Sequence, residues 1–200
     1  MKLILASTSP YRKILLEKLK IPFSCSSPNV DESPLTGESA RELVQRLAQS
    51  KAKAVGSSIN NGFVIGSDQV ASLDGKILGK PGNYDNAFAQ LSAASGRKVT
   101  FHTGLCLLNA NTNRLHSTVE DFVVSFKSLS PQQITTYLQA EQPYDCAGSF
   151  KSEGLGIMLF SALEGRDPNT LVGLPLIRLS ELFTEQGVDL FEHIDLVAYK

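Results

Sequence analysis

The sequence predicts a mixed α/β fold. Short apolar runs that are typical of strands alternate with segments whose apolar residues recur at helical spacing. Helix start signals stand between them: Pro10 follows "STS", and Ser39 with Glu42 matches a capping box. With 200 residues and 42% hydrophobic content, the chain can bury a substantial core, as one compact domain or as two closely packed lobes.

The first predicted elements are a strand, a tight polar turn and a helix. Residues 2–6 form an apolar run that "STSP" stops, and residues 10–20 continue with apolar side chains at helical spacing. Such a junction leaves hydroxyls and unpaired backbone N–H groups at a helix N-terminus, which is a ready anion site. A short strand and a loop rich in Ser and Pro follow over 21–39, and then an amphipathic helix over 40–55.

The alternation continues to the end of the chain. A buried strand within 62–73 places Asp68 at its carboxyl end, and a loop through Gly79 and Pro81 follows. The tail 189–200 is expected to form a last strand or a contact with a partner subunit. Further predicted elements are a helix over 83–95, a long hairpin of strands over 97–110 and 114–129, a helix over 130–141, a β-like run within 144–165, and a loop and helix over 167–186.

Composition and motifs exclude several classes of protein. Lys plus Arg number 19 against 20 Asp plus Glu, so no bulk attraction to a nucleic-acid polymer or an anionic membrane is expected. The apolar N-terminus is too short for a signal peptide, and no run approaches a membrane span. The scattered cysteines fit neither a disulfide framework nor a zinc site. The short apolar N-terminus, the lack of a membrane span and the scattered cysteines together predict a cytoplasmic protein. No P-loop, dinucleotide fingerprint or G-x-S-x-G elbow occurs.

Asp68 and Lys80 are the first candidates for chemistry. An aspartate at the carboxyl end of a buried strand lies where open α/β sheets bind ligands, and it could act as a general base or hold a hard cation. The alternative is a structural cap on the following loop. Lys80, between Gly and Pro, could hold a phosphate as a point charge, or it could be a solvated surface lysine.

Further candidates lie in the first quarter of the chain. Ser7 and Arg12 at the strand-to-helix turn supply donors for an anion, although the same residues also suit ordinary helix capping. Asp31 and Glu32 suit Mg²⁺ or Mn²⁺, or they are solvated turn residues. Lys51 is either a phosphate contact or half of a helical charge pair.

A series of short motifs in one order closely resembles the Maf family of nucleotide pyrophosphatases. The resemblance covers nearly the whole chain and stops before the tail "DLFEHIDLVAYK". Because the motifs occur in register, a chance match is very improbable. The motifs are "LASTSPYR", "VDES", "SKA", "GSDQV", "GKP", "CAGSFKSEG" and "GRDPNTLVGLP".

The resemblance implies hydrolysis of a nucleoside triphosphate between the α and β phosphates, with a divalent cation such as Mg²⁺, Mn²⁺ or Co²⁺. It also implies a mixed sheet with flanking helices, in two lobes around a central cleft, like inosine triphosphatase. Members are often dimeric. We therefore expect a single Maf-like domain over 1–200 that binds a nucleotide and that could form a homodimer.

The family's functional residues match particular positions of this chain. Asp68 matches its catalytic aspartate, described as a proton acceptor, and whether it serves as base or as metal ligand stays open. Glu32 matches the acidic loop residue, the second expected metal ligand. The remaining matches are Lys80, Lys51 and Arg12 for phosphate charge, and Ser7 for the N-terminal serine.

Three departures from the common family pattern indicate the substrate. Tyr11 stands where many members have Arg, and Gln69 stands where they have Thr. The stretch "KSEG", which contains Glu153, stands where they have an Ile-Gln-Gly stretch. At these three positions the chain resembles the subgroup that acts on 7-methyl-GTP. N7-methylguanine is positively charged, so Tyr11 could stack on it with about 0.5–2 kcal/mol of cation–π energy. Glu153 could accept hydrogen bonds from guanine N1–H and its 2-amino group, a donor pair that thymine and uracil lack.

The expected activity is hydrolysis of 7-methyl-GTP to 7-methyl-GMP and pyrophosphate, as house-cleaning of modified nucleotides. Two alternatives stay open. One is a pyrophosphatase for dTTP and UTP or for a broad range of nucleotides. The other is a regulatory nucleotide-binding protein in cell division, since the family is linked to septum formation. A module that only held nucleotide would not need Asp68, which favours the enzyme.

Overall fold

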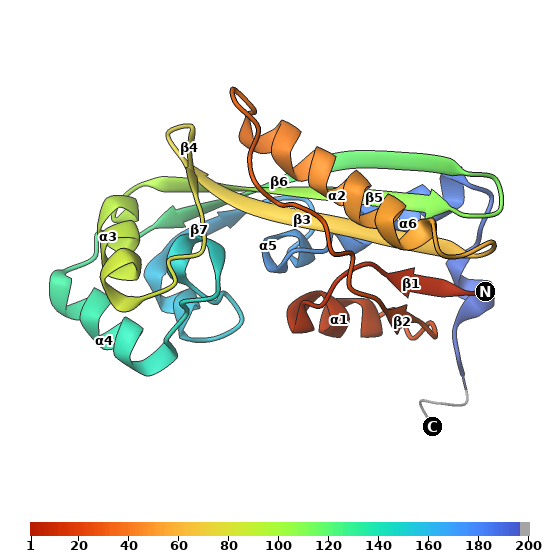
Figure 1. Cartoon of the computed structure of the whole chain (residues 1–200). Helices are drawn as coiled ribbons and strands as arrows, with labels where there is room; N and C mark the ends of the chain where they lie inside the picture. The colour runs from red at the N-terminus through yellow and green to blue at the C-terminus, as the bar shows by residue number, and fades with distance from the viewer. Residues whose placement is uncertain (197–200) are drawn as a thin grey trace. The chain divides into compact units, whose positions relative to one another are not determined.

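The computed structural model describes residues 1–196 and confirms the mixed α/β class (Figure 1). Its sheet has the order β2-β1-β3-β5-β6-β7, with β4 paired to β3 off this path. The strands are β1 (Leu3–Leu5), β2 (Ser24–Cys25), β3 (Phe63–Leu73), β4 (Lys76–Leu78), β5 (Lys98–Asn109), β6 (Arg114–Phe126) and β7 (Phe160–Glu164). The helices are α1 (Pro10–Glu17), α2 (Ala40–Gly56), α3 (Tyr84–Ala94), α4 (Pro131–Glu141), α5 (Asn169–Val172) and α6 (Leu176–Glu185), with 3-10 helices at Ala147–Ser149, Leu155–Leu159 and Leu190–His193.

The chain divides into two compact units. Unit 1 comprises Met1–Asp68, Thr103–Glu120 and Asp167–Lys200, and unit 2 comprises Gln69–His102 and Asp121–Arg166. Strands β3, β5 and β6 contribute residues to both. Two units agree with the two lobes that the sequence implies, whereas the central cleft and the single domain over 1–200 stay predictions.

Unit 1 has helices on both faces of its strands. β1 and β3 are parallel, with Leu5 opposite Ile65, and both side chains enter a core cluster with leucines of α1 and α6. The intervening residues Ile4 and Val64 point to the other face, where they pack with Ala52 of α2. This alternation follows from the period of two along a strand. Figure 1 shows α2 and α1 on opposite sides of β1 and β3.

Glycines let α2 lie very close to the sheet. A Cβ on Gly66 of β3 would run into the backbone carbonyl of Ala48, and a Cβ on Gly104 of β5 would run into the carbonyl of Val44. Only a residue without a side chain fits at such positions. The approach of α2 to β3 therefore depends on the glycine of the motif "GSDQV".

Unit 2 has a core of edge-to-face aromatic rings. The ring of Phe150 contacts Phe101, Phe126 and Phe160, with centroid separations of 5.2, 5.7 and 4.7 Å. Such pairs are favourable beyond the area that they bury. α3 packs against α4 and against the 3-10 helix Ala147–Ser149.

Most predicted helix starts are confirmed. Ser9 caps α1 with Pro10 at its first turn, and both halves of the capping box between Ser39 and Glu42 are present at α2. In the tail, a 3-10 helix forms at Leu190–His193 in place of the expected last strand. The expected strand also included residues 197–200, which lie outside the described residues. Within residues 1–196, no helix is long and apolar enough to cross a membrane.

Two expectations for the segment around Asp68 are wrong. β3 runs on to Leu73, so Asp68 lies within the strand and not at its carboxyl end. The residues after it form a hairpin with β4, where the sequence predicts a loop. Asp74 and Gly75 make its turn with φ of 48° and 78°, and Leu73 pairs with Lys76. Asp-Gly suits such a two-residue turn because it tolerates positive φ, so the signal was present.

The close approach at Gly66 predicts a stability loss. Gly66→Ala should lower the free energy of unfolding by roughly 1–3 kcal/mol, because the added methyl group overpacks the contact with Ala48. Urea unfolding followed by circular dichroism measures this. Gly79→Ala is the matched control, since nothing lies within 4 Å of its added Cβ. Equal stability of the two variants would mean that α2 can move away from β3 without cost.

Candidate functional site

Lys51 is a charged residue in the buried face of α2. It lies one turn from Leu47 and one turn from Val55, which are both buried, and Lys51 itself is only 4% exposed. Lysine is rarely buried to this extent unless its ammonium is paired, because an isolated charge loses its hydration. The position of Lys51 therefore demands acidic partners inside the unit.

The partners are Asp68 and Glu32, and we call these three residues the Lys51 triad. The ammonium nitrogen Nζ lies 2.6 Å from Asp68 Oδ1 and 2.6 Å from Glu32 Oε1. The Asp68 side chain is 10% exposed, whereas that of Glu32 is 59% exposed. The triad thus has one buried carboxylate from β3 and one from the surface loop before α2.

Asp68 lies just beyond the end of a neighbouring parallel strand. β1 ends at Leu5, opposite Ile65, while β3 continues past Asp68. The space beyond the carboxyl end of a strand is where α/β sheets bind ligands. Asp68 therefore lies beyond the end of β1, although its own strand β3 continues past it.

Arg12 shares a backbone acceptor with Ser67, the residue that precedes Asp68 in β3. Its Nε donates to the carbonyl of Gly173 over 3.0 Å, and the same carbonyl accepts a hydrogen bond of 2.9 Å from Ser67 Oγ. Burial lowers the pKa of the Arg12 guanidinium, and the negative charges of Asp68 and Glu32 oppose that shift. Arginine nevertheless stays protonated in proteins, so Arg12 is a second cation close to the two carboxylates.

The turn between β1 and α1 contains Ser7. Its side chain is buried, and its Oγ accepts a hydrogen bond from the backbone N–H of Ser9 over 3.1 Å. Ser9 Oγ in turn accepts from the N–H of Arg12 at the start of α1. These serines thus serve as turn and cap residues. A role for Ser7 in binding an anion stays a prediction.

The triad residues suit a divalent cation. Carboxylate oxygens of Asp68 and Glu32 converge on one point, the Lys51 ammonium, and such hard oxygen ligands are those that Mg²⁺ and Mn²⁺ prefer. Residues 1–196 contain no group of three or more His, Cys, Asp or Glu that could hold a metal. Two carboxylates are enough for Mg²⁺ where phosphates and water complete its coordination.

The other predicted site residues are placed as follows. Tyr11 on α1 in unit 1 is half-buried. Gln69 in β3, Lys80 after β4 and Glu153 belong to unit 2, where Gln69 is half-buried and the other two are exposed. Glu153 accepts a hydrogen bond of 3.1 Å from Ser152 Oγ. The roles of these four residues stay predictions.

A polar chain on neighbouring strands of unit 2 was not visible in the sequence. Ser72 Oγ lies 2.9 Å from His102 Nε2, and His102 Nδ1 lies 2.8 Å from Asp121 Oδ1. The order resembles the serine, histidine and aspartate of hydrolases. Ser72 is only 8% exposed and its Oγ also faces the carbonyl of Thr100, so we interpret the chain as cross-strand hydrogen bonding.

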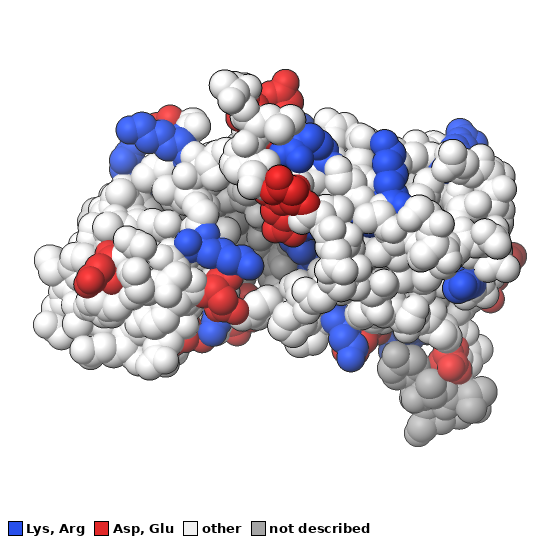
Figure 2. Space-filling model, viewed as in Figure 1, with Lys and Arg blue, Asp and Glu red and all other residues white. Residues whose placement is uncertain are grey.

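Charged side chains on the surface are of both signs. On the face drawn in Figure 2 they lie singly or in small groups, and acidic and basic groups lie next to each other over the loop that leads into α2. Interspersed charges of this kind produce little long-range field. The charges on this face therefore give little directional attraction for an anionic ligand.

Comparison with known proteins shows the family of the chain. The model of the Maf-like protein family matches residues 2–186. The chain belongs to the Maf family. It is 63% identical over 194 residues to a protein of Pseudoalteromonas atlantica named 7-methyl-GTP pyrophosphatase, covering 97% of this chain and 100% of that protein.

Further Maf relatives carry the same name. Those of Colwellia psychrerythraea and Methylobacillus flagellatus are 57% and 54% identical over 187 residues, each covering 94% of this chain, and 94% and 97% of the respective relative. The solved structure of the Staphylococcus aureus Ham1 protein is similar with a TM-score of 0.52 and 13% identity, covering 94% of this chain and 100% of that one. At this identity the likeness concerns the fold alone.

The triad makes a prediction for stability. Lys51→Met should lower the free energy of unfolding at neutral pH by about 3–5 kcal/mol, because the buried carboxylate of Asp68 loses its ammonium partner. Adding Asp68→Asn should recover much of the loss. The control Lys13→Met breaks an exposed ion pair with Glu17 and should cost at most about 1 kcal/mol. Additive losses in the double variant, measured by urea unfolding, would contradict a coupled pair.

Proposed function

We propose that this Maf protein hydrolyses 7-methyl-GTP to 7-methyl-GMP and pyrophosphate, and so removes modified nucleotides. The observation that carries the proposal is the Lys51 triad in a chain 63% identical to a protein named 7-methyl-GTP pyrophosphatase. The triad places buried charges beyond the end of strand β1. We infer the substrate from the names of the relatives. The enzyme class is that of a hydrolase acting on acid anhydrides.

The proposed reaction is an in-line attack of water on the α-phosphorus. The bond between the α-phosphorus and the bridging oxygen breaks, and pyrophosphate leaves with that oxygen. Asp68 accepts the proton of the attacking water or holds a cation, and both roles use its ionised carboxylate. Arg12, Lys51 and Lys80 offset the negative charge that grows on the departing pyrophosphate.

A divalent cation belongs to this proposal. Asp68 and Glu32 are the residues that would hold Mg²⁺, Mn²⁺ or Co²⁺, since their oxygens already converge on a cation. When bound, the cation would polarise phosphate oxygens and neutralise charge. Removal of metal by a chelator should therefore depress turnover severely.

Selection of the base rests on Tyr11, Gln69 and Glu153. We assign Tyr11 to stacking on the cationic methylguanine ring and Glu153 to the N1–H and 2-amino donors. The Glu153 carboxylate is exposed, so it can accept these hydrogen bonds without first breaking a buried ion pair. Gln69 is proposed as a further contact with the nucleotide.

We place the reaction in the cytoplasm. Cys25 and Cys106 are free thiols, as a reducing compartment keeps them. Burial raises the pKa of the Cys106 thiol to about 12, so it would not act as a nucleophile at neutral pH. A homodimer stays a prediction.

The first test is pyrophosphate release from 7-methyl-GTP, GTP, UTP and dTTP, each with Mg²⁺, Mn²⁺ or Co²⁺ and with chelator. Selective, cation-dependent turnover of 7-methyl-GTP is expected, and Asp68→Asn should lower kcat by at least about 100-fold. Asp85→Asn, an exposed aspartate on α3, is the matched control. Turnover of UTP or dTTP alone would contradict 7-methyl-GTP as the substrate. No pyrophosphate release from any of the four nucleotides would favour a binding protein.

Glu153 should determine the preference for a purine. Glu153→Gln replaces an acceptor oxygen with an NH₂ donor that opposes the guanine donors, so kcat/KM for 7-methyl-GTP should fall by roughly 10-fold or more while UTP changes little. The control is Glu164→Gln, which alters another exposed glutamate of unit 2. An unchanged ratio of kcat/KM between 7-methyl-GTP and UTP would remove Glu153 from base selection.

A further inference from the structure

The loop that carries Glu32 has no regular structure of its own. Residues 26–35 lie outside any helix or strand, and most of them are exposed. Such a segment is normally mobile, because ordering its backbone costs entropy that few buried contacts offset. Yet Glu32 Oε1 lies 2.6 Å from Lys51 Nζ. Some other contact must hold the loop against α2.

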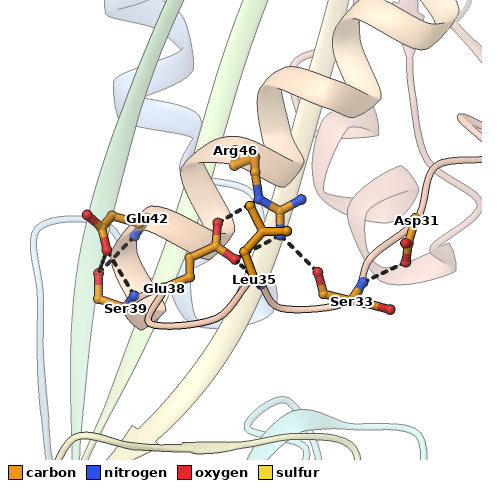
Figure 3. Close-up of polar contacts among 7 residues, drawn as sticks. All are labelled: Asp31, Ser33, Leu35, Glu38, Ser39, Glu42 and Arg46. Atoms are coloured by element: carbon orange, nitrogen blue, oxygen red, sulfur yellow. Dashed lines mark hydrogen bonds and ion pairs between the residues drawn. The ribbon is translucent and has the colours of Figure 1, made fainter.

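Arg46 of α2 makes that contact. Its Nε donates to Glu38 Oε1 over 2.6 Å, and one terminal nitrogen donates to Glu38 Oε2 over 2.8 Å. The same nitrogen donates to the backbone carbonyl of Ser33 over 3.0 Å. Figure 3 shows the guanidinium between the Glu38 carboxylate and Ser33. One side chain therefore fixes the residue next to Glu32 and the residue that precedes the cap of α2.

Local hydrogen bonds stiffen the same segment. The N–H of Ser33 donates to Asp31 Oδ1 over 2.9 Å, and the N–H of Leu35 donates to Glu38 Oε2 over 3.0 Å. In the sequence, Glu32 thus lies between Asp31 and Ser33, which hydrogen bonds connect to Arg46. We call the Arg46–Glu38 pair with its bond to Ser33 the loop clamp.

The loop clamp stays charged. The Glu38 side chain is 7% exposed and that of Arg46 is 29% exposed. The hydrogen bonds from Arg46 lower the pKa of Glu38 to about 2, so the pair remains ionised at any pH suitable for an assay. Bidentate pairing needs the planar fork of arginine, which lysine cannot reproduce.

We propose that Arg46 and Glu38 are positioning residues, which set Glu32 against Lys51 and thereby complete the triad. Arg46 precedes Lys51 by five positions, about 7.5 Å along the helix axis, so one rigid helix fixes the loop and also carries the lysine that Glu32 contacts. The kinetic part of this inference rests on the proposed function. The structural part, an ordered loop at 31–35, does not.

The test uses Arg46→Lys and Glu38→Gln in the full chain. Each should lower kcat for 7-methyl-GTP by about 10-fold to 100-fold with a smaller change in KM, because Glu32 is misplaced and not removed. Amide hydrogen exchange at residues 31–35, apart from Pro34, which has no N–H, should become faster in both. Arg178→Lys is the matched control, since Arg178 also bridges two glutamates, on α6. Circular dichroism checks that each variant is folded.

A double-mutant cycle separates positioning from direct action. If Arg46 acts through Glu32, the variant Glu32→Gln/Arg46→Lys should lose no more activity than Glu32→Gln alone. Multiplied losses would mean that Arg46 acts on the substrate directly, and unchanged exchange at 31–35 would overturn the clamp. If the unaltered protein hydrolyses none of the nucleotides, the proposed function fails, while hydrogen exchange still decides the clamp.

Discussion

The buried ammonium of Lys51 is the constraint on which the rest of the site depends. A charge at this depth is tolerated only when it is paired, and removal of a partner is costly. For Asp68 to be that partner, α2 must lie close to β3, which explains why a glycine at position 66 faces Ala48. For Glu32 to be the second partner, an irregular loop must be held against the same helix.

Helix α2 therefore links the core to the chemistry. Its apolar residues anchor it on the sheet, Lys51 extends that buried face with a charge, and Arg46 faces the loop. Because these residues lie on one rigid element, packing under α2 fixes the loop and the ammonium together. A loss of packing at Gly66 would therefore alter the site as well as the stability, although Gly66 itself contributes no functional group.

Local signals made much of the fold predictable from the sequence, whereas contacts across strands and loops could not be predicted. The cap at Ser39 and the helical period of α2 are local, so this helix was predicted correctly. The sequence predicts Asp68 at the end of a strand, yet the Asp-Gly hairpin extends β3 to Leu73. The pairing of Glu38 with Arg46 depends on how a loop folds back, which no periodicity encodes.

The balance of charges is a physical argument for the divalent cation that we propose. Lys51 and Arg12 provide two positive charges, and Asp68 with Glu32 provides two negative ones, so this group in unit 1 is close to neutral. A triphosphate brought to a neutral group would meet little net attraction, and the carboxylates would repel it. The proposed divalent cation would reverse the balance, because it would convert the repelling carboxylates into the ligands of an attracting charge.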